Sequence, residues 1–231
     1  MSSAMNRINN MIVLENITKT YQTHRGPVDA LVDLDLSIPE GQFVVIRGPS
    51  GSGKTTLLLT LAGMQHPTSG KLLIAGKNIY NLSNRLRANF RAQNIGFVFQ
   101  MFHLVPYLSV VDNVALAGPA AGNNHDITKA RNLLEKLGLA ERIFHKPAQL
   151  SAGEKQRTAI ARALYNNPKI ILADEPTGNL DPENASAVLD HLAQFHRRGG
   201  TVIIVTHGLI ADQYADRIIN LRQGRLENPP A

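Results

Sequence analysis

The sequence predicts an α/β protein with a mostly parallel β-sheet and an inserted helical lobe. In the first and last thirds of the chain, apolar runs of strand length alternate with segments of helical periodicity, which is typical of strand–helix–strand units. The middle, from about residue 81 to 166, is mainly helix and loop by the same criteria. With 231 residues, 43% of them apolar, the chain is long enough to bury a substantial core.

Local patterns place the individual elements of the first two thirds. Short apolar runs predict strands at Ile12–Leu14, Leu31–Ile38, Phe43–Ile46 and Lys71–Ile74, and a leucine-rich helix at Leu57–Leu61. In the middle, helical spacing is followed by Ile127, Ala130, Leu133, Leu134 and Leu137. Gly138 then stands where a left-handed helix cap is expected.

The last third returns to the α/β pattern. Asp181 is a good N-cap and Pro182 a good first helical residue. The apolar face of that helix ends before Gly199-Gly200, and Thr201–Thr206 has the composition of a buried strand. Arg217–Leu226, with Gln223-Gly224 inside it, predicts a closing hairpin.

Composition excludes some classes of site and leaves others open. The chain has no cysteine, so disulfides and thiolate metal sites are excluded. The start, Met1–Asn10, has no apolar signal core, and apolar runs such as 202–205 are far below the roughly 20 residues of a spanning helix. We therefore expect a chain that does not cross a membrane by itself.

The net charge of +6 is compatible with binding to a nucleic acid, a lipid surface or a phosphate ligand, and also with an ordinary soluble protein.

A glycine-rich segment predicts a phosphate-binding loop. The strand at 43–47 runs directly into Gly48-Pro49-Ser50-Gly51-Ser52-Gly53-Lys54-Thr55-Thr56, which matches G-x-x-x-x-G-K-[ST] and precedes a helix. Glycines let backbone N–H groups turn toward phosphate oxygens, and the following helix points its positive end at them. Lys54 is expected to bridge the β- and γ-phosphates of a nucleoside triphosphate, and the Thr55 hydroxyl to bind Mg²⁺.

Two adjacent acids follow a later apolar strand. Ile170–Ala173 runs into Asp174 and Glu175. A carboxylate at the carboxyl end of a strand beside the phosphate loop can hold Mg²⁺, the role we assign to Asp174. Glu175 is expected to polarise the water that attacks the γ-phosphate. A strand capped by solvated acids is the simpler alternative, but the Pro176–Asp181 loop that follows favours the catalytic interpretation.

Further motifs resemble those of a known protein family and follow one another in the same order as in that family. Leu150–Arg157 resembles the signature of ABC-transporter ATP-binding subunits, usually Leu-Ser-Gly-Gly-Gln, and lies between the phosphate loop and Asp174. By itself it predicts a helix N-terminus capped by Ser151, beside glycine, which attracts anions. Ala152 and Glu154 depart from the usual residues, as does Gly208, which stands where an acid is frequent.

The resemblance implies roles for single residues across about 11–226. Ser151 and Gly153 would cover the γ-phosphate held by a partner chain, and Gln100 would reach Mg²⁺ and hinge the lobe. His207 would contact the γ-phosphate, and Asn179–Asp181 would cross the dimer interface. Tyr21 would stack on adenine. Individually, Gln100, His207 and Tyr21 also suit a surface amide, a core histidine and a packing residue.

The same resemblance implies an architecture. It is a P-loop NTPase (RecA-like) α/β core with an antiparallel β subdomain and an inserted α-helical subdomain. We expect one domain over 11–226, with the catalytic core at about 11–95 and 165–226 and the helical subdomain at about 96–164. The motif sequences are most similar to those of the lipoprotein-releasing and macrolide-exporting branch of the family.

The implied function is Mg²⁺-dependent ATP hydrolysis that powers transport. A homodimer or a pair with a sister ATPase chain would drive a transmembrane subunit at the cytoplasmic face of the inner or plasma membrane, without nucleic acid. Met101–Val114 would transmit motion to a groove for the membrane partner. An ATP-gated dimer that signals to a membrane partner without transport fits the same residues. A DNA- or ribosome-acting ABC protein would need paired cassettes, a coiled-coil insertion or cysteines, and a kinase would need an acceptor site.

Overall fold

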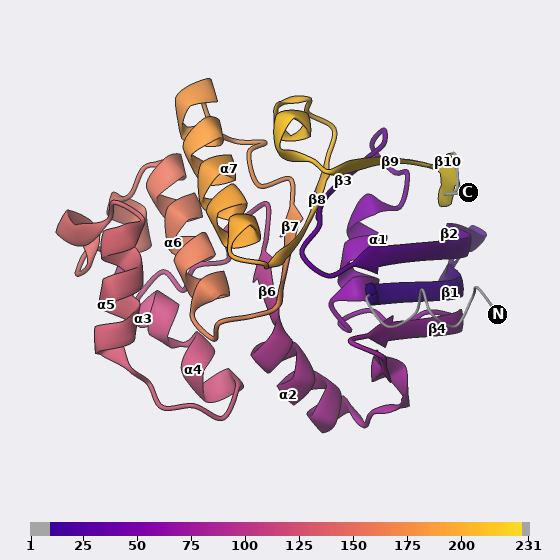
Figure 1. Ribbon diagram of the computed structural model, residues 1–231, viewed down its shortest axis with the longest axis horizontal. Coiled ribbons are helices and arrows are strands. Elements are labelled where there is room, and N and C mark those ends of the chain that lie inside the picture. The colour runs from indigo at the N-terminus through magenta and orange to yellow at the C-terminus, as the bar shows by residue number, and fades with distance from the viewer. Residues whose placement is uncertain (1–9, 228–231) are drawn as a thin grey trace.

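Two β-sheets and the helices around them form the computed structural model, which describes residues 10–227 (Figure 1). The predicted α/β class is confirmed. The part of the expected signal-free start that covers residues 1–9 lies outside the described residues.

The strands fall into a small antiparallel sheet and a larger, mostly parallel one. In chain order they are β1 (Asn10–Thr23), β2 (Gly26–Pro39), β3 (Phe43–Arg47), β4 (Ser69–Ile74), β5 (Lys77–Asn78), β6 (Ile95–Val98), β7 (Ile170–Asp174), β8 (Thr201–Thr206), β9 (Arg217–Arg222) and β10 (Arg225–Glu227). The four-stranded sheet has the order β2-β1-β4-β5 with antiparallel pairing. The six-stranded sheet has the order β10-β9-β3-β8-β7-β6, and only β10 pairs antiparallel.

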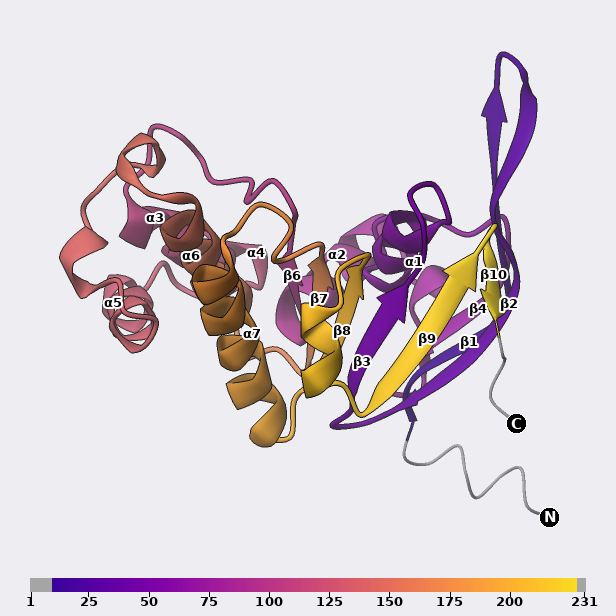
Figure 2. The ribbon, with the colours of Figure 1, turned by 90° about the horizontal axis from the view of Figure 1, so that it is seen from above.

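The helices lie mostly on the side of the large sheet away from the antiparallel sheet (Figures 1 and 2). They are α1 (Lys54–Leu61), α2 (Asn84–Asn94), α3 (Val110–Ala115), α4 (Ala117–Ala120), α5 (Ile127–Lys136), α6 (Ala152–Leu164) and α7 (Pro182–Arg197). Short 3₁₀ helices occur at Ile79–Asn81, Ala140–Arg142, Pro147–Gln149 and Ile210–Tyr214.

Alternation along the central strands explains why their sequences are continuous apolar runs. Phe43 and Val45 pack into a core shared with α3, α5, α6 and α7, whereas Val44 and Ile46 pack into a second core with α1 and the antiparallel sheet. Successive side chains of a strand point to opposite faces. A strand covered on both faces is therefore apolar at nearly every position, and every residue of β7 and β8 is buried.

Several local predictions are confirmed. Gly138, which follows the C-cap residue Leu137 of α5, has φ of 69°, the left-handed conformation that glycine adopts without strain. Asp181 caps α7 through its side chain, and Pro182 is the first helical residue. The expected closing hairpin is β9–β10.

Strand β6 was not among the strands that the sequence predicted. It pairs in parallel with β7, from Ile95 opposite Ile170 to Val98 opposite Ala173, and its four residues are buried. A four-residue apolar run is too short for its periodicity to separate a strand from buried helix or loop. The expected start of the helical subdomain at about residue 96 falls inside this strand, so we propose that the lobe begins at Phe99.

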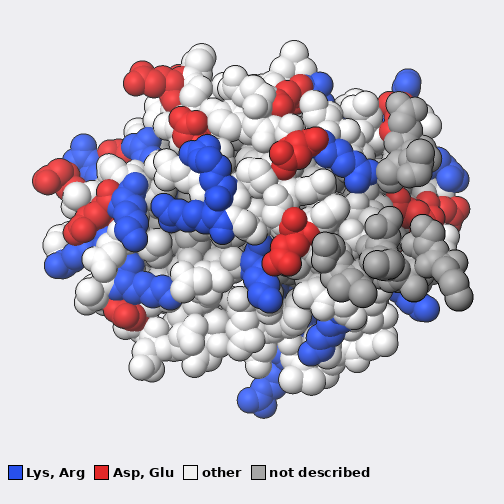
Figure 3. Space-filling view, in the orientation of Figure 1, with Lys and Arg blue, Asp and Glu red and all other residues white. Residues whose placement is uncertain are grey.

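The phosphate loop and the carboxyl ends of β3, β7 and β8 lie at one edge of the large sheet. The outer part of the β1–β2 ribbon projects beyond the body of the molecule (Figure 2). In the described part of the chain, no helix has the length and apolar character needed to span a membrane. On the face drawn in Figure 3, basic and acidic side chains are interspersed.

Candidate nucleotide site

A cavity of about 540 Å³ opens beside the phosphate loop. It brings together most of the predicted nucleotide residues, although they come from separate segments of the chain. Its lining residues are Ala30, Ser50, Gly51, Gly53, Lys54, Thr55, Thr56, Gln100, Glu175 and His207.

The glycines of the loop serve two different purposes. Gly51 has φ of +77°, and no atom lies within 4 Å of where its Cβ would be, so its backbone faces open space. A Cβ at Gly48 would instead lie 2.1 Å from the Leu221 carbonyl oxygen, and one at Gly53 would lie 2.2 Å from that of Ala30. Their Cβ atoms would collide with neighbouring strands.

Lys54 closes the loop on itself. Its Nζ donates to the carbonyl oxygens of Gly48 at 2.7 Å and Pro49 at 3.0 Å, and the residue is 8% exposed. The first N–H groups of α1 have no acceptor within their own helix and carry its positive dipole end. Ser52 is buried beneath the loop, and its main-chain oxygen accepts from Gly224. The loop is thus braced from behind by the β9–β10 hairpin.

Thr55 and Asp174 place two oxygen atoms that could bind a cation side by side. Thr55 Oγ1 donates to Asp174 Oδ1 at 3.3 Å, which joins the start of α1 to the end of β7. Burial raises the pKa of the Asp174 carboxyl above 3.8, and nearby Glu175 adds to the rise, while the Thr55 bond and Lys54 oppose it. A hydroxyl and a carboxylate are ligands that suit Mg²⁺.

Glu175 is held by donors from the neighbouring strand. It has a positive φ of 43°, a conformation that costs a non-glycine residue about 1–3 kcal/mol. Its main-chain N–H donates to the Val205 oxygen at 2.9 Å. Its carboxylate accepts from Thr206 Oγ1 at 2.8 Å and from the His207 main chain at 3.1 Å, and His207 Nδ1 lies 2.8 Å away.

Gln100 lines the cavity, and the segment after it is tied to α6. Phe102 and His103 both have positive φ values, of 58° and 47°. Arg162 of α6 donates to their carbonyl oxygens at 2.7 Å and 2.6 Å. Burial lowers the pKa of Arg162. This guanidinium therefore fixes the path of the chain leaving Gln100.

The predicted signature residues lie apart from the cavity. Ser151 caps α6 by accepting from the Glu154 main chain at 3.2 Å, and Glu154 accepts in return from the Ser151 main chain at 2.8 Å. Ala152 is exposed at the first helical position, where its methyl group is accommodated. Neither Ser151 nor Gly153 is among the residues that line the cavity.

Glu154, a departure from the signature, is neutralised locally. Arg142 Nε donates to its Oε1 at 2.7 Å. Hydrogen bonding by Arg142, and then by the Ser151 main chain, lowers the pKa of the carboxyl below 4.5. Glu154 is therefore a paired anion at the helix N-terminus.

Tyr21 is a predicted site residue that the cavity does not include. It lies on the β1–β2 ribbon opposite Val28, and Lys19 Nζ lies 5.0 Å from its ring centroid. Its stacking on adenine stays a prediction.

The sequence reasoning missed several residues that shape the site. Ala30 lines the cavity from β2, and Thr206 holds Glu175. Arg47, directly before the loop, forms an ion pair with Asp212, which follows His207 in the 3₁₀ helix at 210–214. The one local signal that could have identified two of these residues was that Thr206 and Arg47 stand next to motif residues in the sequence.

Comparison with known proteins decides the family. The family model described as "ABC transporter" matches residues 31–178, which is more than half of the chain. The chain belongs to the ABC transporter family. The resemblance inferred from the motifs is therefore confirmed.

Relatives agree with this assignment. The cassette is 42% identical to the lipoprotein-releasing system ATP-binding protein LolD 2 of Caulobacter vibrioides, covering 94% of this chain and 96% of that protein. It is 44% identical to the macrolide export ATP-binding/permease protein MacB of Chlorobaculum tepidum, covering 93% of this chain but 33% of that longer protein.

The fold comparison reaches the same conclusion. A dimeric post-hydrolysis structure of the ATP-binding cassette MJ0796, bound to ADP and Pi, has a TM-score of 0.89 and 39% identity. It covers 94% of this chain and 97% of that one. The predicted fold, and the class of ABC ATPase subunit, are confirmed.

Proposed function

We propose that this cassette binds and hydrolyses ATP as one member of a pair, and that the pair drives a separate membrane subunit. One observation carries the proposal: the cavity gathers Lys54, Gln100, Glu175 and His207 but not the signature residues Ser151 and Gly153. The capped start of α6 is a second anion-attracting site. A head-to-tail pair brings that second site to the nucleotide of the other chain.

The described residues divide the chemistry among them. The first N–H groups of α1 and Lys54 bind the phosphates, so Lys54 exchanges its two carbonyl partners for phosphate oxygens. Glu175, fixed by Thr206 and His207, orients the attacking water. Charge that develops on the γ-phosphate is stabilised by Lys54, by His207 and by Ser151 of the partner subunit.

We propose Mg²⁺ as the cofactor, held by Thr55, Asp174 and Gln100. The 3.3 Å contact between Thr55 Oγ1 and Asp174 Oδ1 supports the first two, and Gln100 lines the same cavity. When bound there, the cation would supply positive charge that neutralises phosphate oxygens.

The proposed contact for the membrane subunit is a groove beside the segment that follows Gln100. It has a volume of about 430 Å³ and is lined by residues that include Met64, Ala88, Arg91, Phe97 and Arg162. Burial lowers the pKa of both arginines, with nearby Arg87 adding to the effect on Arg91. No Asp or Glu is among the described lining residues, so the groove suits an apolar segment with an acidic residue.

Because Arg162 lines the groove and holds the chain after Gln100, it connects the proposed membrane contact to the nucleotide cavity. The proposed membrane contact supports a location of the cassette at the cytoplasmic face of the inner or plasma membrane. The named relatives make lipoprotein release or macrolide export the transport classes that we propose.

The pairing is tested by steady-state hydrolysis against protein concentration, with Mg²⁺-ATP in excess. We expect specific activity to rise with concentration, because two chains build each complete site, and we expect ATP to produce a dimer of Glu175→Gln. Specific activity independent of concentration, from a species that remains monomeric by sedimentation, contradicts the paired mechanism.

The groove is tested by site-directed cross-linking, since the chain has no cysteine of its own. A cysteine introduced at Ala88 should cross-link to an integral membrane protein in membranes of the native host. A cysteine introduced at Ser186, on α7 outside the groove, is the matched control. Equal yields from both positions contradict the proposed contact.

A further inference from the structure

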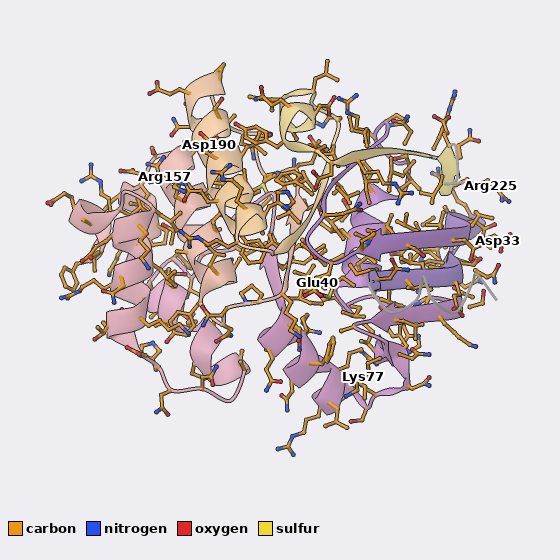
Figure 4. The ribbon with its side chains drawn as sticks, viewed as in Figure 1. Asp33, Glu40, Lys77, Arg157, Asp190 and Arg225 are labelled. Carbon is orange, nitrogen blue, oxygen red and sulfur yellow. The ribbon has the colours of Figure 1, made fainter. Side chains whose placement is uncertain are left out.

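A side-chain bridge joins α6 to the N-terminal end of α7. Asn184, the third residue of α7, accepts a hydrogen bond at its Oδ1 from Arg157 Nη1 of α6 at 3.1 Å. Its Nδ2 donates to Asp181 Oδ2 at 2.7 Å. Figure 4 shows Arg157 where the two helices meet. One amide therefore contacts both the helix that carries the signature and the loop that precedes α7.

Gly153 packs against the same amide. A Cβ at this position would lie 2.3 Å from Asn184 Oδ1 and 2.6 Å from its Cγ, distances that real Cβ atoms essentially never show. Gly153 is buried in α6 and is not among the residues with positive φ, so its backbone does not require glycine. Space for the Asn184 side chain is what excludes a larger residue within this chain.

The loop end of the bridge is also fixed. Asp181 caps α7 by accepting from the Asn184 main chain at 2.9 Å, so Asn184 bonds both carboxylate oxygens. These two bonds lower the pKa of Asp181. The segment Ser151–Gly153 and the loop Asn179–Asp181 are thereby linked through one residue.

We propose that Asn184 is a positioning residue that locks Ser151–Gly153 to Asn179–Asp181. The two segments that a cassette offers to the nucleotide of its partner then move as one unit. Position 153 is glycine because Asn184 occupies the space beside it. This inference rests on the paired mechanism proposed above. It explains the glycine at position 153 by packing within the chain, and not by the close approach of a phosphate held by the partner chain.

A double-mutant cycle tests the proposal in the Glu175→Gln background. Gly153→Ala and Asn184→Ala are made singly and together, and the ATP-driven dimer constant is measured by sedimentation. We expect Gly153→Ala to weaken dimerisation about tenfold when Asn184 is present and less than about twofold when it is alanine, because contacting residues are not additive. Equal losses in both backgrounds, or no loss in either, overturn the proposal.

A second readout separates positioning from general damage. Asn184→Ala by itself should lower kcat about fivefold while ATP affinity of the single chain is unchanged. Ser186→Ala is the control, because its hydroxyl donates only within α7, to Pro182. A fall in monomer ATP affinity that matches the fall in kcat overturns the positioning role.

The cycle also distinguishes failure of the wider mechanism. A Glu175→Gln parent that does not dimerise with ATP contradicts the paired mechanism. Thermal midpoints of the same four proteins then decide the packing contact. Gly153→Ala should lower the midpoint when Asn184 is present and leave it unchanged when Asn184→Ala has already removed the amide. Equal midpoint losses in the two backgrounds overturn the contact.

Discussion

His207 Nδ1 lies 2.8 Å from Glu175 Oε1, and the main-chain N–H of His207 donates to the same oxygen at 3.1 Å. The two residues are 32 positions apart in the chain. They meet because β7 and β8 are parallel neighbours that end at the same edge of the sheet. The geometry fixes the orientation of the Glu175 carboxylate at the cavity, and such preorganisation lowers the cost of orienting an acceptor during the reaction.

Replacing Glu175 with Gln should reduce steady-state hydrolysis about 100-fold or more, because the amide does not accept the proton of the attacking water. ATP binding and ATP-driven dimerisation should remain. Glu183→Gln, in the exposed first turn of α7, is the control and should keep its activity. If Glu175→Gln turns over ATP at more than half the normal rate, the assigned role is wrong.

Replacing Lys54 with Ala should remove ATP binding while leaving the fold intact. The Nζ donates to main-chain oxygens of Gly48 and Pro49, and Asp174, which loses a nearby positive charge, keeps its hydrogen bond from Thr55. At a ligand concentration 100 times the dissociation constant, ATP stabilises the protein by about 2.7 kcal/mol. Calorimetry should show this stabilisation in the parent and not in the variant; an equal rise in both contradicts the phosphate role.

Replacing Tyr21 with Ala tests the stacking role that the cavity leaves undecided. Stacking of a base on an aromatic ring contributes about 1–3 kcal/mol, so ATP affinity should fall about fivefold or more. Tyr21→Phe should retain affinity. Tyr107→Ala, which removes a tyrosine that is 75% exposed elsewhere, is the matched control. Unchanged ATP affinity in Tyr21→Ala means that adenine is held by other residues.

Replacing Arg162 with Gln should loosen the chain after Gln100. The variant loses the two bonds that hold Phe102 and His103 in left-handed conformations. We expect hydrolysis to fall about tenfold, since small misplacement of a reacting group is costly. Limited proteolysis should cut more rapidly between residues 101 and 109. Arg131→Gln, in α5, is the control; matching proteolysis of the Arg162 variant and the parent contradicts the bracing role.

The pair formed by Glu154 and Arg142 should make stability depend on pH. Because the folded-state pKa of Glu154 is lowered below 4.5, its contribution is present above that value and is lost as pH falls through the folded pKa. The midpoint difference between the parent and Glu154→Gln should therefore be largest near neutrality and shrink below about pH 4.5. Calorimetry from about pH 3 to 7 measures it, with Glu135→Gln as control. A difference that is constant with pH excludes the pair as its source.

The sequence by itself determined the features that each segment encodes locally. The spacing around Gly48–Thr56 and the acids after the apolar run at 170–173 predicted a nucleotide site, and Asp181-Pro182 predicted a helix start. The helices and the strand of those segments form as expected. Such patterns succeed because capping, periodicity and glycine conformation depend on residues a few positions apart.

Tertiary structure decided what lies between segments that are distant in the chain. Strand β6 was recognisable only by its pairing with β7, since four apolar residues carry no clear period. The contacts of Glu175 with His207, of Gly48 with Leu221 and of Gly153 with Asn184 all depend on which strands and helices become neighbours. Sheet order and helix packing set those neighbours through burial of both faces of the sheet, which no local pattern specifies.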